Sequence, residues 1–202
     1  MIFKPLVISG PMMRAYLADL KTQTRRMIKP QPDEDGLVKL KGELVWHDTS
    51  SREYRPPIQP SEFIWWREGL YRFCSPATND HPCYSADGAG VLVPGKIGVR
   101  ALWPWKGKRL SSRFMPKWAC RAVAEVEEVR AERVQNISEE DAIAEGFASV
   151  QEFADYWNKL HGRRAWERND WIWIYRFRPL KGEELKKALE VLSGKLVGGK
   201  ID

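Results

Sequence analysis

The chain has 202 residues, and its 33 Lys and Arg outnumber its 27 Asp and Glu by six. Hydrophobic residues make up 43% and charged residues 30%, which excludes a disordered chain and is typical of a globular protein of one domain. No stretch approaches the roughly 18 apolar residues of a membrane span. The three cysteines lack the spacing of metal ligands or of a disulfide framework, so we expect a cytoplasmic protein without membrane contact.

Tryptophan and positive charge are both in excess. The chain has ten tryptophans, and its isoelectric point is near 9.2. Base stacking on tryptophan and phosphate contacts with Lys and Arg would account for this composition. The alternative is that tryptophan fills a small core while the basic residues keep the protein soluble.

The first part of the chain predicts a strand, a helix and a second strand. Residues 4–8, Lys-Pro-Leu-Val-Ile, predict a short, mainly apolar strand, and Ser9 can cap a helix that ends near residue 20. Alternate threonines favour a strand over 21–26. Residues 30–62 are rich in Pro, Asp, Ser and Gly, and therefore predict a long excursion with one small hairpin.

Strands dominate the remainder. We expect a strand over 63–68, a second excursion over 74–113 around a short strand near Tyr84, and the longest strand from Met115 onward. Capping boxes and terminal glycines predict helices over 138–146 and 149–162. A run that is apolar on both faces predicts a central strand over 171–178, and a basic helix follows from Lys181.

This order of elements predicts an α+β fold. Few strands alternate regularly with helices, so a mixed β-barrel decorated by helices fits better than a parallel sheet. The long insertions lie at about 30–62 and 74–113. We expect one domain over 1–180 and an appended basic tail over 181–202.

The densest cluster of reactive residues is segment 21–26, Lys-Thr-Gln-Thr-Arg-Arg. Thr22, Thr24 and Arg26 share one face of a regular strand, so Lys21 and Thr24 converge only if Lys21 precedes the strand. Neighbouring guanidiniums would lower the pKa of Lys21 and make it a candidate base, with Thr24 as nucleophile or hydrogen-bond donor. The alternative is a basic strand that contacts phosphate or solvent.

Two further segments suggest ligand contacts. Trp118 could stack on a base while Arg121 holds a phosphate, but Trp118 equally suits a core. In 65–68, Trp-Trp-Arg-Glu, one tryptophan should face inward and the other outward, with Arg67 or Glu68 in an ion pair. The three histidines are scattered, so we expect no metal site and no cofactor.

Segment 21–26 resembles the ASCH domain family of the PUA-like superfamily, whose motif is G-x-K-x-x-E-x-R. Lys21 and Arg26 match this motif, whereas Asp19 and Thr24 stand where Gly and Glu are usual. The chain is more narrowly similar to phage and prophage ASCH-like proteins, which share K-T-x-T-R-R, M-P-R-W-A-S-R and W-V-W-V. The corresponding segments here are 21–26, 115–121 and 171–174, and the resemblance spans about residues 4–178.

The resemblance implies a PUA-like barrel that binds RNA, DNA or a modified nucleoside in a bacterial host cell. The residues that we assign to nucleic-acid or ligand binding are Thr22, Arg25, Arg26, Trp66, Glu68, Tyr84, Trp118 and Arg121.

Bacterial N4-acetylcytidine amidohydrolases are also ASCH-like and carry K-T-x-T-x-R. Their pattern implies Lys21 as base, Thr24 as nucleophile and Glu145 as proton carrier. Thr24 would attack the acetyl carbonyl, Lys21 would take its proton, and Glu145 would assist the leaving amine. Some ASCH proteins are ribonucleases, which adds a further enzyme class. Besides nucleic-acid or nucleoside binding and amide hydrolysis, a third hypothesis is that the chain is a phage accessory protein without enzymatic activity that binds a host protein.

Overall fold

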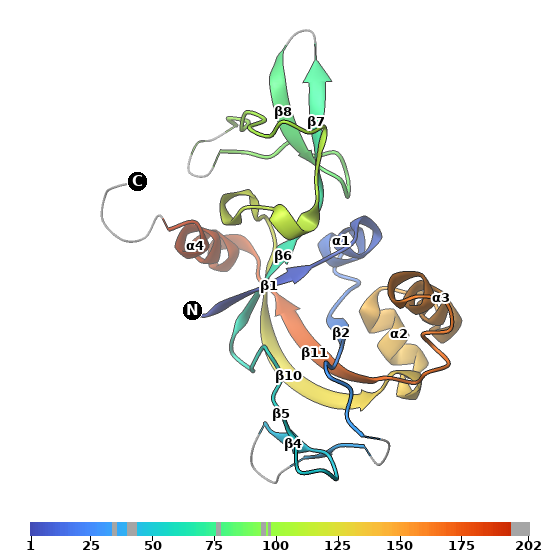
Figure 1. The fold of residues 1–202 in the computed structure, drawn as a ribbon. Coiled ribbons are helices and arrows are strands. Elements are labelled where there is room, and N and C mark those ends of the chain that lie inside the picture. The colour runs from blue at the N-terminus through green and yellow to red at the C-terminus, as the bar shows by residue number, and fades with distance from the viewer. Residues whose placement is uncertain (34–35, 40–43, 76–77, 94–95, 97, 195–202) are drawn as a thin grey trace. The chain divides into compact units, whose positions relative to one another are not determined.

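The computed structural model describes residues 1–33, 36–39, 44–75, 78–93, 96 and 98–194 (Figure 1). Of the described residues, 26% are helix and 31% strand, which confirms the mixed α+β class. The strands of the described residues form several sheets and no closed barrel.

The chain separates into two compact units, each built from non-contiguous segments. Unit one consists of Met1–Leu17, Glu62–Glu125 and Pro179–Asp202, and unit two of Ala18–Ser61 and Val126–Arg178. Whether one ASCH-like domain spans residues 1–180 stays a prediction.

Unit one pairs its strands in the order β1, β6, β10. β1 (Phe3–Val7) runs parallel to β6 (Phe63–Arg67), and β6 runs antiparallel to the first residues of β10 (Val123–Arg133). Helix α1 (Gly10–Leu17) buries Met12, Met13 and Tyr16, and the Tyr16 hydroxyl donates a 2.7 Å hydrogen bond to the Val123 carbonyl. The predicted strands over 4–8 and 63–68 are therefore confirmed, and the predicted helix is present but ends at Leu17 rather than near residue 20.

A second sheet of unit one was not expected from the sequence. It has the order β8, β7, β9, formed by β8 (Thr78–Tyr84), β7 (Leu70–Ser75) and β9 (Arg109–Leu110). Pro82 within β8 suggests a loop in the sequence, but β8 is the outer strand, where proline is tolerated.

The longest strand begins later than predicted. Met115 lies between two 3-10 turns, η1 (Ser112–Phe114) and η2 (Lys117–Ala119), and the strand starts only at Val123. The Pro116 and Lys117 carbonyls accept hydrogen bonds from the Ala119 and Cys120 amides, at 3.1 and 3.0 Å. Backbone groups of residues 116–120 therefore bond to each other within the turn. The alternation of apolar and polar residues around Trp118 and Cys120 does not reflect a strand.

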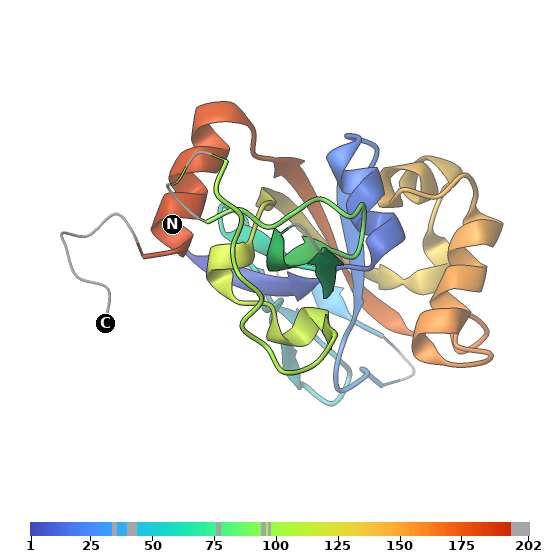
Figure 2. The ribbon, with the colours of Figure 1, turned by 90° about the horizontal axis from the view of Figure 1, so that it is seen from above.

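Helix α4 (Gly182–Leu192) follows the predicted start of the basic segment and belongs to unit one. Its apolar residues recur at helical spacing, and Ala188 and Leu192 are buried in the same cluster as Ala119 and Val123. Figures 1 and 2 both show α4 beside turn η2. The helix is thus a packed element of the unit.

Unit two pairs its long strands in the order β10, β11, β2. β11 (Trp171–Pro179) is antiparallel to β2 (Gln23–Met27), with Tyr175 opposite Thr24. Residues 172–175 are all buried, which confirms the predicted central strand. The excursion over 30–62 contains three two-residue strands rather than one hairpin, namely β3 (Val38–Lys39), β4 (Trp46–His47) and β5 (Glu53–Tyr54).

The helices of unit two begin and end at the predicted residues. Ser138 caps α2 (Glu139–Glu145) by accepting a hydrogen bond from the Asp141 amide, and Gly146 ends it with a φ of 94°. Ser149 caps α3 (Val150–His161) in the same way. Turn η3 (Val134–Asn136) connects β10 to this region. None of the described helices has the length and apolar character needed to cross a membrane.

Candidate functional site

The predicted site residues form two clusters, and each lies within one unit. Lys21, Thr22, Thr24, Arg25, Arg26 and Glu145 belong to unit two. Trp66, Glu68, Tyr84, Trp118 and Arg121 belong to unit one.

In unit two, Lys21 and Glu145 meet in a buried ion pair. Lys21 lies two residues before β2, which begins at Gln23 rather than at residue 21 as predicted, and Glu145 is the last residue of α2. The Lys21 Nζ lies 2.6 Å from Glu145 Oε2 and 2.8 Å from the Glu145 carbonyl oxygen, to which it also donates. Both side chains are almost fully inaccessible, with Lys21 only 2% exposed. The condition set by the sequence, that Lys21 precede the strand, is met.

Burial lowers the pKa of Lys21 below its ordinary value, because a charged amine loses its hydration there. Glu145 opposes this effect by attracting the ammonium group. The guanidiniums of Arg26 and Arg25 lower the pKa further. The expected contribution of these arginines is present, but desolvation is larger.

Arg25 links β2 to α2 through hydrogen bonds. Its Nη2 donates to Asp141 Oδ2 at 2.7 Å, and its Nη1 donates to Glu145 Oε1 at 3.2 Å. Gln23 donates to the other oxygen of Asp141 at 2.8 Å. This network neutralises two buried cations with two carboxylates and positions Glu145 beside Lys21.

Thr24 is buried, and strand alternation places it on the opposite face of β2 from Gln23 and Arg25. Within the described part of the chain, Thr24 makes no hydrogen bond with Lys21 or Glu145. Thr22 contributes its backbone, donating to the Ala144 carbonyl at 2.8 Å and accepting from the Phe177 amide at 2.9 Å. The structure therefore brings together the predicted base and proton carrier, but not the predicted nucleophile.

In unit one, Arg121 is engaged by carboxylates on every nitrogen. Its Nε and Nη2 donate to the two oxygens of Glu68 at 2.7 and 2.8 Å, and its Nη1 donates to Asp87 at 2.8 Å. The guanidinium carbon lies 3.8 Å from the Tyr84 ring centroid. The sequence predicts an ion pair of Arg67 or Glu68, and Glu68 is the residue that forms one. Its side chain is buried, with 1% exposure.

The tryptophans of β6 are both buried, which corrects the expectation that one faces outward. Trp65 is 5% and Trp66 0% exposed. Trp66 packs edge-on against Tyr16, with ring centroids 5.7 Å apart. Both faces of this strand are covered, so side chains that alternate between its two faces are buried on either face.

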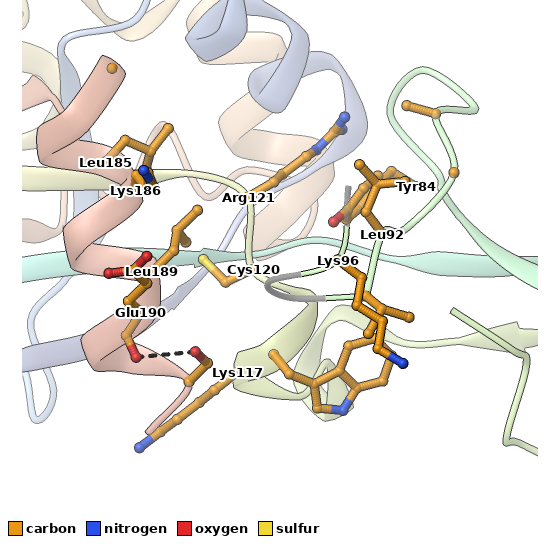
Figure 3. A pocket seen from close by; sticks show the side chains of 16 residues that line it. Tyr84, Leu92, Lys96, Lys117, Cys120, Arg121, Leu185, Lys186, Leu189 and Glu190 are labelled. Atoms are coloured by element: carbon orange, nitrogen blue, oxygen red, sulfur yellow. Dashed lines mark hydrogen bonds between the residues drawn. The ribbon is translucent and has the colours of Figure 1, made fainter. Parts of the chain in front are cut away.

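Unit one contains a pocket with a cavity volume of about 800 Å³. Figure 3 shows α4 on one side of it, Tyr84 and Leu92 on the other, and Cys120 between them. Three predicted residues, Tyr84, Trp118 and Arg121, are among its lining. The contribution of α4 could not be foreseen, because it depends on packing between segments about 70 residues apart.

A tryptophan cluster adjoins the pocket. Trp105 lies nearly parallel to the pocket residue Trp118, with ring centroids 6.2 Å apart and an interplanar angle of 7°. Trp103 packs edge-on against Trp105 at 4.8 Å, and all three rings are half-buried. Trp103 and Trp105 were missed, although their spacing within a basic segment is a visible signal.

The sequence around this cluster carries the positive charge of the whole protein. Residues 88–124 contain eight Lys and Arg and no Asp or Glu. The remaining 25 basic residues are outnumbered by the chain's 27 acidic residues. Positive charge and accessible tryptophan rings therefore coincide on one segment of unit one.

No family model matches the chain, and no curated protein or solved structure matches it. Among the described residues, no group of three or more His, Cys, Asp or Glu is arranged to hold a metal ion.

Proposed function

We propose that this protein binds single-stranded nucleic acid through unit one, as an ASCH-like protein of PUA-like ancestry. Trp103, Trp105 and Trp118 provide faces for base stacking, and the basic residues of segment 88–124 other than Arg121 contact the phosphates. We call this surface, formed by the three tryptophans and these seven basic residues, the tryptophan–lysine surface. The observation that carries the proposal is the coincidence of these rings with a segment that lacks acidic residues.

The charge distribution supports a polyanionic ligand. Without segment 88–124 the chain would be slightly acidic, so the positive charge is concentrated rather than spread for solubility. Lys106, Lys108 and Arg109 are exposed, directly after Trp105. Such a density of cations favours binding that releases counterions from a phosphate backbone.

The tryptophan geometry supports a single strand. The Trp103 Nε1 donates to the Gly107 carbonyl at 2.9 Å, which fixes its ring within the loop. Half-buried rings that are held in place can accept the face of a base, and a duplex hides those faces. Arg121 is a poor phosphate ligand here, because its guanidinium already contacts Glu68 and Asp87.

The first test is the anisotropy of fluorescent single-stranded RNA and DNA oligonucleotides titrated with the protein at several salt concentrations. Removing two phosphate contacts with Lys106→Ala/Lys108→Ala should reduce the salt slope by roughly 1.4, at about 0.7 per contact on a single strand. Trp105→Ala should weaken binding by about 1–3 kcal/mol.

The matched control is Lys159→Ala/Lys187→Ala, which removes two exposed lysines outside segment 88–124. This variant should keep the slope and affinity of the wild type. The proposal fails if neither RNA nor DNA binds at low salt, or if the control loses as much affinity as the test variant.

A second candidate function is amide hydrolysis of an N-acylated nucleoside such as N4-acetylcytidine. The specific observation in its favour is the Lys21–Glu145 contact, together with the lowered pKa of Lys21. An amine that loses its proton below the ordinary range is a competent base. Thr24 would have to approach this pair when substrate is bound.

Incubation with N4-acetylcytidine, with chromatography for cytidine, tests this candidate. Thr24→Ala and Lys21→Met should abolish turnover, whereas Thr49→Ala, at an exposed threonine, should not. The rate should rise with pH with a midpoint below the ordinary pKa of lysine, because burial lowers the pKa of Lys21. Absence of product with the wild type, or full activity of Thr24→Ala, would reject the assigned roles.

A further inference from the structure

The pocket of unit one differs chemically from the tryptophan–lysine surface beside it. Its walls are largely apolar, formed by Leu92 and Val93 on one segment and by Leu185 and Leu189 on α4. The cavity volume of about 800 Å³ lies in the range of small-molecule sites. A pocket of this size and composition suits a ligand with a substantial apolar body.

The polar groups that line the interior are already satisfied within the protein. The Tyr84 hydroxyl donates to the Ala119 carbonyl at 2.9 Å, and the Ser193 hydroxyl donates to the Glu190 carbonyl at 3.1 Å. Arg121 is held by Glu68 and Asp87. These groups have little capacity left for the edge of a ligand.

Cys120, between the walls, is also uncharged. Burial raises the pKa of its thiol to about 12, and the Sγ donates to the Ala122 carbonyl at 3.3 Å. A nucleobase placed here would leave its own donors and acceptors without partners, which costs about 1–3 kcal/mol for each buried group. The interior therefore disfavours a base and favours hydrocarbon or an unsubstituted aromatic ring.

The exposed lining residues have the opposite character. Lys96, Lys117 and Lys186 are all exposed, and Lys186 lies 3.4 Å from Glu183 in an exposed ion pair, which contributes little in water. Glu190 is the one carboxylate among the lining residues, and no carboxylate of the described residues pairs with Lys96 or Lys117. The entrance therefore attracts an anion, and the interior accepts its apolar part.

We propose that this pocket binds a small amphipathic anion, a molecule with an apolar body and one terminal carboxylate, sulfonate or phosphate. The apolar body occupies the space between α4 and residues 84–93, and the anionic group contacts Lys117 and Lys186. The site differs in ligand chemistry from the nucleic-acid surface, and the proposal does not rest on nucleic-acid binding.

The probe is 1-anilinonaphthalene-8-sulfonate, which combines apolar rings with one sulfonate, titrated into the full chain. We expect a saturable rise in fluorescence with one site per chain, confirmed by calorimetry. Lys117→Ala/Lys186→Ala should raise the dissociation constant roughly tenfold, since each partly screened charge contributes about three- to fivefold.

The control is again Lys159→Ala/Lys187→Ala. Lys187 neighbours Lys186 on the same helix but does not line the pocket. This variant should bind the probe as the wild type does. Equal weakening in both double variants, or a fluorescence rise that does not saturate, would overturn the proposal.

Displacement of the probe tests the sign of the charge independently. Dodecanoate and dodecyltrimethylammonium have the same apolar chain and opposite charge, and dodecan-1-ol has none. We expect dodecanoate to displace the probe at the lowest concentration and the cation at the highest. If the cation competes as well as the carboxylate does, the anion specificity is wrong.

Discussion

Arg121 is a basic residue that suits phosphate binding but is instead paired with carboxylates of the protein. As a basic residue near Trp118, it suggests a phosphate contact. In the fold, two of its nitrogens bind Glu68 and a third binds Asp87, while its plane lies over Tyr84. Glu68 is buried, so its charge depends on this arginine.

Replacing Arg121 with Ala should therefore be strongly destabilising. It leaves the Glu68 carboxylate buried without its cation, which costs about 3–5 kcal/mol of unfolding free energy. Asp87→Ala should cost at most about 1 kcal/mol, because Asp87 is more exposed and Glu68 keeps its partner. Urea unfolding measures both.

The double variant Glu68→Met/Arg121→Met separates the ion pair from packing. It removes both charges and retains apolar volume, so it should be more stable than Arg121→Ala alone. If Arg121→Ala costs no more than Asp87→Ala, the pair does not sustain the buried carboxylate.

At the scale of elements, helix α2 positions Glu145 in the buried site of unit two, and its two ends are set by local sequence. The helix has only seven residues, and its position is set by the Ser138 cap, by Gly146 and by contacts of Asp141 and Glu145 with β2. Isolated helices of this length are not stable in water. Its ends and its ion pairs therefore determine where Glu145 lies.

Ser138→Ala should lower the unfolding free energy by about 1 kcal/mol, because the Asp141 amide loses its acceptor. Ser138→Asp keeps an oxygen at the cap and should retain most of the stability. Chemical denaturation followed by circular dichroism compares the two. Equal stability of the Ala and Asp variants would show that the cap does not hold α2.

At the scale of the molecule, the tryptophan–lysine surface and the pocket share residues. Lys117 and Trp118 line the pocket and also belong to the segment that carries the excess positive charge. An anion in the pocket would neutralise part of this charge and occupy one face of Trp118. The two ligands should thus weaken each other's binding by the same factor.

Dodecanoate should accordingly raise the dissociation constant of a single-stranded oligonucleotide, whereas dodecan-1-ol should have a smaller effect. The expected change is several-fold, the size of a coupling of about 1 kcal/mol. Anisotropy titrations at fixed salt measure it. An unchanged constant at saturating dodecanoate would show that the two sites are independent.

The local signals of the sequence were sufficient for much of the secondary structure. The Ser138 and Ser149 caps and the terminal glycines predict helices whose hydrogen bonds are short in range, and the apolar run of β11 predicts a buried strand. The short strand near Tyr84 is confirmed by β8, but β7 was missed, and residues 115–122 were wrongly assigned to a strand although Pro116 starts a turn.

The sequence by itself determined the α+β class, the ends of α2 and α3, and the concentration of positive charge in residues 88–124. These properties follow from composition and from interactions within a few residues. Only the tertiary structure decided that Glu68 and Asp87 occupy Arg121, that Trp65 and Trp66 are both buried, and that α4 forms a wall of the pocket. Each of these depends on contacts between residues that lie 34 to about 100 positions apart, and the buried polar groups must find partners there because water is excluded.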